Sequence, residues 1–251
     1  MRCAAIVTLS GALSGVYLLV PAALAAPTEP ETLLVPLDPA GTCLDCHAFP
    51  NPVDREDEPA FAPVLWQGSM MANAARDPVF WAAVAIADQD APGQTIDCIR
   101  CHAPKAFLEG RGDATQMDAL LPDDLDGVSC DLCHRLVDDG ATPAGNARYT
   151  VDDLVGVKGV PRRGPWTYGP RDLAPSHDWA GPDPHIASSR SCGTCHDVTT
   201  EAERVDEDGN GLGVGFGEQR TYSEWLGSAF AAPGEDFRSC QDCHMPAVAD
   251  V

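Results

Sequence analysis

One five-residue pattern, Cys-x-x-Cys-His, occurs five times along this chain of 251 residues. Two thiols at this spacing can add to the two vinyl groups of one haem, and the histidine that follows becomes the proximal ligand of its iron. The sequence therefore predicts five covalently attached c-type haems. The attachment cysteines are Cys43, Cys46, Cys98, Cys101, Cys130, Cys133, Cys192, Cys195, Cys240 and Cys243, and the proximal histidines are His47, His102, His134, His196 and His244.

Two other uses of paired cysteines compete with haem attachment. Zinc ribbons combine two Cys-x-x-Cys pairs on one metal, but they do not require a histidine after each pair. A disulfide framework suits an exported chain with an even number of cysteines. Neither explains why ten of the eleven cysteines fall in the same pattern. The remaining one, Cys3, lies in the N-terminal segment.

That N-terminal segment is typical of a secretory signal peptide. A basic start at Arg2 precedes an apolar run from Ala4 to Val20, and Ala23-Leu24-Ala25 resembles a small-residue cleavage site. The alternative is an uncleaved anchor helix, for which the apolar run is short. Residues 1–25 are therefore predicted to be removed, which places the protein in a bacterial periplasm or outside the cell. No later segment is apolar enough to span a membrane.

The charge of the chain limits its partners. The formal net charge is −22 at pH 7, so binding to an anionic nucleic acid is not expected. Acidity favours encounter with positively charged proteins. The predicted partners are other redox proteins with basic docking surfaces.

The fold is predicted to be mainly α with long irregular loops, little or no β-sheet, and a core built around the haems. Successive motifs begin 55, 32, 62 and 48 residues apart, which is too short for a separate domain around each haem. We expect residues 26–41 to form an extended lead-in and residues 42–251 to form one pentahaem domain. Glycine, proline and aspartate are frequent from Asp138 to Pro184, which predicts a loop there.

Two helices have recognisable starts. Asp77 is a candidate N-cap, Pro78 suits the first helical position, and the apolar, alanine-rich run continues to Ala87. The segment Thr221-Tyr-Ser-Glu224 matches a capping box and predicts a helix that ends before Pro233. Each of these helices precedes a haem motif.

The chain has fewer histidines than five haems would need as axial ligands. Five irons have ten axial positions, and the chain has seven histidines. His177 and His185 are therefore predicted distal ligands. Met70 and Met71 are the next candidates, with Met71 the residue we assign as a ligand, because His/Met ligation is common in c-type haems. One or two irons then lack an identified sixth ligand. Such an iron could bind a small molecule, or an unassigned residue or a second chain could close it.

A short internal repeat accompanies the motifs and carries a resemblance. Residues 66–72 (WQGSMMA) match residues 225–231 (WLGSAFA). With His185 and Ser188 before Cys192, and Cys-x-x-Cys-His-Met-Pro at 240–246, this pattern resembles the multihaem c-type cytochromes. These include the tetrahaem cytochrome of ammonia oxidisers, pentahaem nitrite reductase and octahaem hydroxylamine oxidoreductase.

The resemblance implies closely stacked haem pairs, with chemistry confined to members that keep an open iron. Two departures matter. Where the family pattern would place a distal histidine, this chain has Met71 and Phe230, and phenylalanine cannot bind iron. The Cys-x-x-Cys-Lys pattern of nitrite reductase is absent from the sequence.

A second metal site is suggested at residues 206–211 (DEDGNG), which resemble the start of a calcium loop. The twelfth position, where an EF-hand has glutamate, is Gly217, and Glu218 comes one residue late. An acidic surface turn is the alternative interpretation of this segment.

The leading functional hypothesis is an exported multihaem cytochrome that carries electrons between redox partners. The alternative is an oxidoreductase acting on a small nitrogen, sulfur or oxygen species at an open haem, which would require a five-coordinate iron and a substrate pocket. A structural unit of a larger cytochrome assembly is a third hypothesis. The sequence leaves open whether the protein is an enzyme.

Overall fold

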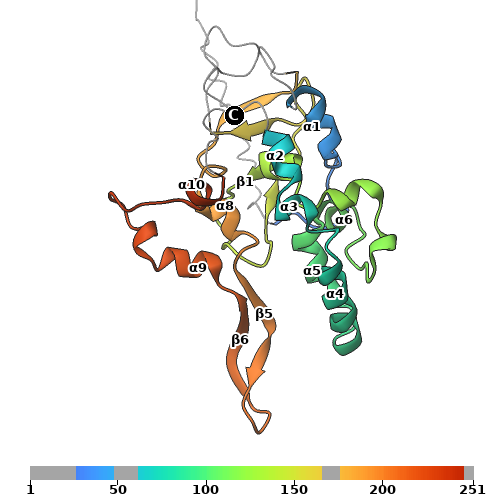
Figure 1. Ribbon diagram of the computed structural model, residues 1–251, viewed down its shortest axis with the longest axis vertical. Helices are drawn as coiled ribbons and strands as arrows, with labels where there is room; N and C mark the ends of the chain where they lie inside the picture. The colour runs from blue at the N-terminus through green and yellow to red at the C-terminus, as the bar shows by residue number, and fades with distance from the viewer. Residues whose placement is uncertain (1–26, 48–61, 166–175, 246–251) are drawn as a thin grey trace, which may run out of the picture.

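The computed structural model describes residues 27–47, 62–165 and 176–245 (Figure 1). The predicted signal peptide lies outside the described residues. The α-helices are α1 (Ala40–His47), α2 (Ala62–Gln67), α3 (Met70–Asn73), α4 (Pro78–Asp90), α5 (Thr95–His102), α6 (Pro104–Leu108), α7 (Cys130–Arg135), α8 (Ser189–Gly193), α9 (Thr221–Leu226) and α10 (Cys240–His244). Short 3-10 helices are η1 (Met117–Ala119), η2 (Pro122–Asp126) and η3 (Ala229–Ala231).

Six strands in the described residues form three separate two-stranded sheets. The strands are β1 (Leu136–Val137), β2 (Thr150–Val151), β3 (Arg162–Gly164), β4 (Trp179–Pro182), β5 (Val198–Val205) and β6 (Gly211–Gln219). The pairs β1–β2 and β5–β6 are antiparallel, whereas β3–β4 is parallel. The β5–β6 hairpin extends away from the helices (Figure 1).

The first predicted helix is confirmed as α4. The side chain of Asp77 accepts a hydrogen bond from the backbone N–H of Val79, and Pro78 is the first helical residue. Both features act locally, which is why the sequence predicts this start. The helix continues to Asp90, three residues beyond the predicted apolar run.

The second predicted helix exists as α9, but its predicted capping box is wrong. Thr221 is already helical, and the N-cap is Arg220, whose side chain makes no capping hydrogen bond. A tertiary contact fixes this helix start instead, because the backbone N–H of Tyr222 donates to the carbonyl of His196 at 3.0 Å. The helix ends at Leu226, before Pro233 as predicted.

Strands occur where the sequence predicts loop. The strands β2, β3 and β4 lie within or beside the Gly- and Pro-rich segment 138–184 and have only two to four residues each. Runs this short do not establish the alternation that predicts a strand. In β6 the alternate residues are glycines, which are uncommon in strands.

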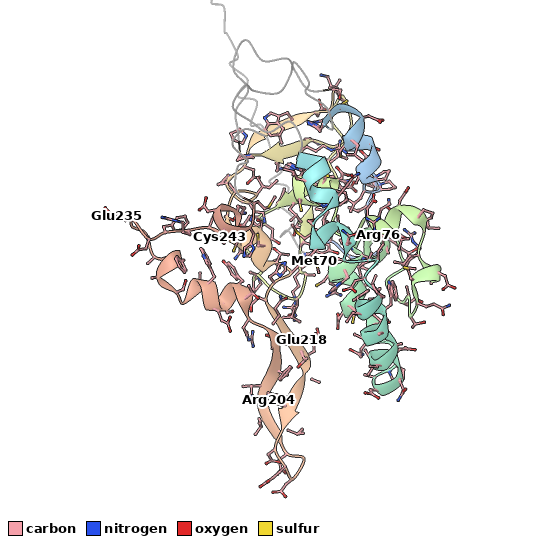
Figure 2. The ribbon with its side chains drawn as sticks, in the orientation of Figure 1. Met70, Arg76, Arg204, Glu218, Glu235 and Cys243 are labelled. Carbon is pink, nitrogen blue, oxygen red and sulfur yellow. The ribbon has the colours of Figure 1, made fainter. Side chains whose placement is uncertain are left out.

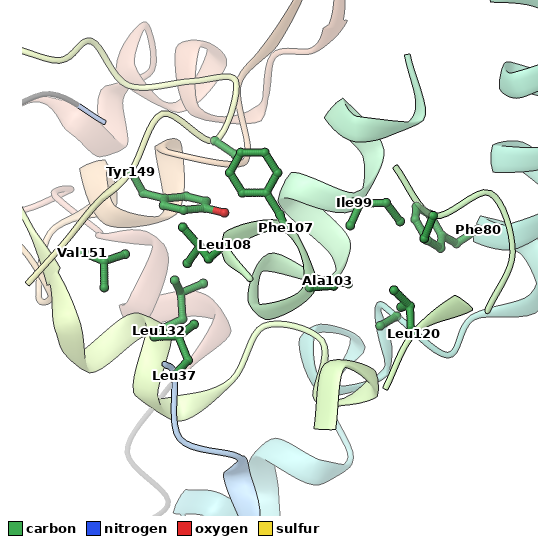
Figure 3. Packing of buried hydrophobic residues seen from close by; sticks show 14 of the residues in the cluster. Leu37, Phe80, Ile99, Ala103, Phe107, Leu108, Leu120, Leu132, Tyr149 and Val151 are labelled. Carbon is green, nitrogen blue, oxygen red and sulfur yellow. The ribbon is translucent and has the colours of Figure 1, made fainter. Parts of the chain in front are cut away.

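The hydrophobic core connects helices from the first half of the chain with β2 (Figure 3). Phe107 and Tyr149 pack edge to face, with ring centroids 6.4 Å apart. Motif cysteines lie beside this core, because Cys98, Cys101 and Cys195 pack against its buried members. The second, third and fourth motifs therefore each contribute residues to one packed interior, since Leu132 of the third motif also belongs to the core.

Residues 27–39 contain no helix or strand, and α1 begins at Ala40, within the lead-in predicted for residues 26–41. The lead-in is held firmly against the third motif. Arg135, which is completely buried, donates to the backbone carbonyls of Val35 and Pro36 at 3.1 Å each. Its guanidinium also pairs with Asp131 and Asp153, both at 3.2 Å.

No helix among the described residues is both long enough and apolar enough to cross a membrane.

Candidate haem-attachment sites

Short helices present the motif residues on one side. The motifs at 43–47, 98–102, 130–134 and 240–244 lie entirely within α1, α5, α7 and α10. At positions i, i+3 and i+4 of a helix, two cysteines and a histidine share one face. The fourth motif adopts a similar turn at the end of α8, where the N–H groups of Cys195 and His196 donate to the carbonyl of Cys192 at 3.2 and 3.0 Å. All ten motif cysteines are free thiols.

Thiols from different motifs lie against one another. Cys43 of the first motif is hydrogen-bonded to Cys130 of the third, and this contact raises the pKa of Cys43 while it lowers that of Cys130. Cys101 of the second motif is likewise hydrogen-bonded to Cys195 of the fourth. The described chain thus pairs the first motif with the third and the second with the fourth.

Two further electrostatic interactions between thiols connect these pairs and add the fifth motif. Burial raises the pKa of Cys133 in the third motif to about 11, and the fourth motif's Cys192 adds to this increase. Burial also raises the pKa of Cys192 to about 11, with additional contributions from Cys240 of the fifth motif. The fourth motif is therefore next to the second, third and fifth motifs.

The motif histidines have neighbours consistent with this arrangement. Burial lowers the pKa of His134, and the nearby imidazoles of His47 and His177 lower it further. Burial also lowers the pKa of His102, with a smaller contribution from His196. Burial lowers the pKa of His196 too, and His244 adds to this effect. A lowered pKa favours neutral imidazole, the form that binds iron.

Several rings have the surroundings expected of iron ligands. Nδ1 of His134 lies 2.5 Å from the backbone oxygen of Arg163. A hydrogen bond from Nδ1 to a carbonyl fixes the ring and leaves Nε2 for a metal. Nδ1 of His102 is buried without a hydrogen-bond partner, and the ring stacks on Phe80 with centroids 4.1 Å apart. The thiols and imidazoles of this site fit covalent haem.

The two predicted distal histidines lie in different places. His177 is close enough to His134 to affect its pKa, and its Nδ1 is 2.9 Å from the backbone oxygen of Asp178. It therefore belongs with the neighbouring first and third motifs. His185 is buried, and its Nδ1 has no hydrogen-bond partner. It lines a small cavity together with Leu136, just after the third motif, and Thr194 in the fourth.

The internal repeat forms two matching local structures. The indole nitrogen of Trp66 donates to the carbonyl of Val128, and that of Trp225 donates to the carbonyl of Arg238, each at 2.8 Å. Val128 and Arg238 both lie two residues before the first cysteine of a motif. In space, Trp66 therefore serves the third motif rather than the second, which follows it in sequence.

The candidate ligand Met71 and its counterpart Phe230 hold equivalent backbone positions. The N–H of Val128 donates to the carbonyl of Met71, and the N–H of Arg238 donates to the carbonyl of Phe230, both at 3.0 Å. Met71 is half-buried, and the backbone of Ala74, which follows its helix, lies near enough to His102 to raise the pKa of that imidazole, against the larger effect of burial. Met70 is 81% exposed. Phe230 is 55% exposed.

The calcium-like segment forms the tip of the β5–β6 hairpin. The carboxylate of Asp206 accepts hydrogen bonds from the backbone and side-chain nitrogens of Asn210, and these contacts lower its pKa. Among the residues that the structure describes, no group of three or more His, Cys, Asp or Glu side chains is arranged to hold a metal ion directly. Calcium binding remains a prediction.

A polar cavity of about 340 Å³ lies at the base of the hairpin, close to the fourth motif. Its walls include Asn146, Arg148, Glu201 and Arg220. Arg148 lies 4.0 Å from Glu201, so part of its charge is compensated. Sequence patterns did not identify this cavity, because its residues come from segments that are distant along the chain.

Comparison with protein-family models, with curated proteins and with solved structures finds no match for this chain.

Proposed function

We propose that this protein is an exported electron-transfer protein that holds five covalent haems and exchanges electrons with other redox proteins. The observation that carries the proposal is the connection between motifs. Cysteines and histidines place the first motif beside the third, and the fourth beside the second and the fifth. Cys133 and Cys192 lie close enough to interact electrostatically, which links the two groups.

The residues of the chain have distinct tasks in this function. Paired thiols attach each haem, and buried neutral histidines bind and orient its iron. Haem, when bound, supplies the metal that takes up and releases an electron. The shared core limits access of water, and burial and nearby charge adjust the potential of each site.

The number of attached haems tests the proposal directly. Protein exported from a bacterial host that matures c-type cytochromes should contain five haems per chain, measured by the spectrum of the pyridine complex against protein mass. Replacing Cys240 and Cys243 with serine should remove one haem. A chain that carries zinc or disulfides and no haem would contradict the proposal.

The oxidoreductase alternative is favoured by one observation. Phe230 holds the backbone position that Met71 holds in the other copy of the repeat, and its side chain has no atom that can bind iron. Carbon monoxide added to the reduced protein separates the two functions. An electron carrier in which every iron has two axial ligands should stay low-spin, and carbon monoxide should not change its spectrum. High-spin signals and carbon monoxide binding would support an enzyme.

A further inference from the structure

The β5–β6 hairpin, which we call the arm, is anchored at its base and exposed beyond it (Figure 1). The side chain of Asn146 makes two hydrogen bonds with the backbone of Thr199, at 2.9 and 2.8 Å. The side-chain nitrogen of Gln219 lies 3.1 Å from Nδ1 of His196 in the fourth motif. Every residue from 201 to 214 is exposed. Because an isolated two-stranded hairpin is marginally stable in water, such an arm benefits from an external contact.

Apolar side chains are displayed along the arm. Leu212, Val214 and Phe216 in β6 are 49%, 55% and 53% exposed, and Val205 in β5 is 60% exposed. Val214 and Phe216, two residues apart, point to the same side of the strand. Grouped exposed apolar residues mark interaction surfaces more often than single ones do.

At two of the four glycines of β6, Gly211 and Gly215, other atoms of the arm fill the space where a side chain would lie. A Cβ atom at residue 211 would collide with the carboxylate of Glu203, and one at residue 215 would collide with the carbonyl of Thr200. The arm's own atoms therefore cover these glycine positions. The apolar side chains between them have no comparable cover, so they are available to a partner.

Acidic residues share the arm with the apolar residues. The arm has six carboxylates and one guanidinium, and Figure 2 shows the side chains of Arg204 and Glu218 extending from its two strands. An apolar surface framed by negative charge is complementary to one framed by lysine and arginine. The carboxylates belong to Glu201, Glu203, Asp206, Glu207, Asp208 and Glu218, and the guanidinium belongs to Arg204.

A second copy of this chain fits the arm poorly. Two arms would bring like charges together, and the whole chain has a net charge of −22. The pairing register of β5 with β6 also shifts at several points, including between the pairs Thr199–Gly217 and Glu203–Gly215. Irregular register and exposed charge both disfavour pairing of strand edges between molecules.

We propose that the arm is the docking surface for a cationic redox protein whose apolar contact patch is ringed by basic residues. This inference rests on the proposed electron-transfer function and names the partner class. The arm begins two residues after His196, so a docked partner would lie near the fourth motif, which neighbours three others. One electron moves within the docked pair, so one protein is oxidised as the other is reduced, and no bond forms or breaks.

The test uses a small cationic monohaem cytochrome c as the probe and the full exported chain. Electron exchange is followed by stopped-flow absorbance at low and high salt. The charge variant is Glu207→Gln, Asp208→Asn and Glu218→Gln, which spares Asp206 because its carboxylate holds the turn. The apolar variant is Leu212→Ser, Val214→Ser and Phe216→Ser.

Matched controls change the same kinds of residue on other elements. The charge control is Asp90→Asn, Asp118→Asn and Asp123→Asn, all at exposed positions. The apolar control is Val79→Ser and Ile86→Ser in α4, where these side chains are 73% and 62% exposed.

The charge variant should lower the second-order rate constant about tenfold at low salt and much less at high salt, because salt screens steering. The apolar variant should lower it about tenfold at both salt concentrations, whereas the controls should stay within about twofold of the unmodified protein. Arm variants that match their controls would overturn the docking proposal. Sedimentation showing a dimer that only the apolar variant dissociates would also overturn it, because a second copy would then cover the arm.

Haem content and calorimetric binding of the probe, measured on the same samples, separate this proposal from the proposed function. Five haems with no effect of the arm variants would refute docking alone. A chain without haem would refute electron transfer, and calorimetry would still show whether the arm binds the cationic protein.

Discussion

Trp66 and Trp225 have equivalent positions beside two Cys-x-x-Cys-His motifs. Each indole donates to a carbonyl that lies two residues before a Cys-x-x-Cys-His motif. Each is followed three residues later by a serine that caps the next short helix, since Ser69 accepts from Ala72 and Ser228 accepts from Phe230. The short repeat in the sequence thus corresponds to a structural unit that positions the residues leading into a motif.

Removing one indole hydrogen bond should therefore affect a specific haem. Trp66→Phe should destabilise the protein by about 1 kcal/mol and change the spectrum or potential of the third haem. Trp225→Phe should do the same for the fifth. The measurements are denaturant unfolding and a redox titration resolved by haem. A change confined to the second haem in Trp66→Phe would contradict this assignment.

Met71 offers a second prediction at the residue scale. If its thioether binds iron, Met71→Ala should lower one haem potential or open that iron, because a methionine ligand raises the potential relative to histidine. The neighbouring variant Met70→Ala is the control, since Met70 is 81% exposed. An unchanged spectrum and unchanged potentials in Met71→Ala would remove this residue from the set of ligands.

At the scale of elements, features that act within one helical turn could be predicted from the sequence. Contacts between residues that are distant along the chain could not. Asp77 and Pro78 determine the start of α4, and both act within its first turn. The start of α9 depends on a hydrogen bond from Tyr222 to His196, which is distant in sequence. The strands β1 to β4 are too short to leave a pattern. Sequence therefore predicted both helices and the start of α4, but not the contact at the start of α9 or which strands pair.

The lead-in and α7 form one such tertiary connection through Arg135. Its guanidinium is buried among carbonyls of the lead-in and two carboxylates. Leaving those carboxylates without their partner is costly in a buried site. Arg135 also follows His134 directly in the chain. Its contacts therefore connect the stability of the lead-in with the third motif.

Arg135→Met should accordingly lower the free energy of unfolding by about 3–5 kcal/mol. The matched control is Arg148→Met, whose exposed pair with Glu201 at 4.0 Å should contribute no more than about 1 kcal/mol. Both values come from denaturant unfolding of the haem-loaded chain. Equal losses of unfolding free energy in the two variants would show that burial does not strengthen the contacts of Arg135.

At the scale of the whole molecule, the fourth motif has the most neighbours. Its thiols and its histidine lie near residues of the second, third and fifth motifs. For the first motif, Cys43 and His47 lie near Cys130 and His134 of the third motif. Removing different attachment sites should therefore have unequal consequences for electron exchange.

Replacing Cys192 and Cys195 with serine should slow electron equilibration among the remaining four haems by at least about tenfold. This is because the second and fifth sites lose their common neighbour. Replacing Cys43 and Cys46 should leave exchange among the other four nearly unchanged. Flash reduction followed by absorbance measures both variants, and circular dichroism confirms that each is folded. Similar rates in the two variants would contradict a central fourth site.

The sequence by itself determined the ten thiols, the five histidines beside them and the helical spacing that places them on one face. It could do so because these relations span at most five residues. It also predicts a shortage of distal ligands for five haems, which follows from counting the histidines. Tertiary structure decided which motifs are neighbours, which motif each tryptophan serves, and that the β5–β6 arm extends from the fourth site. Those relations arise between residues tens of positions apart, where packing rather than spacing sets the distance.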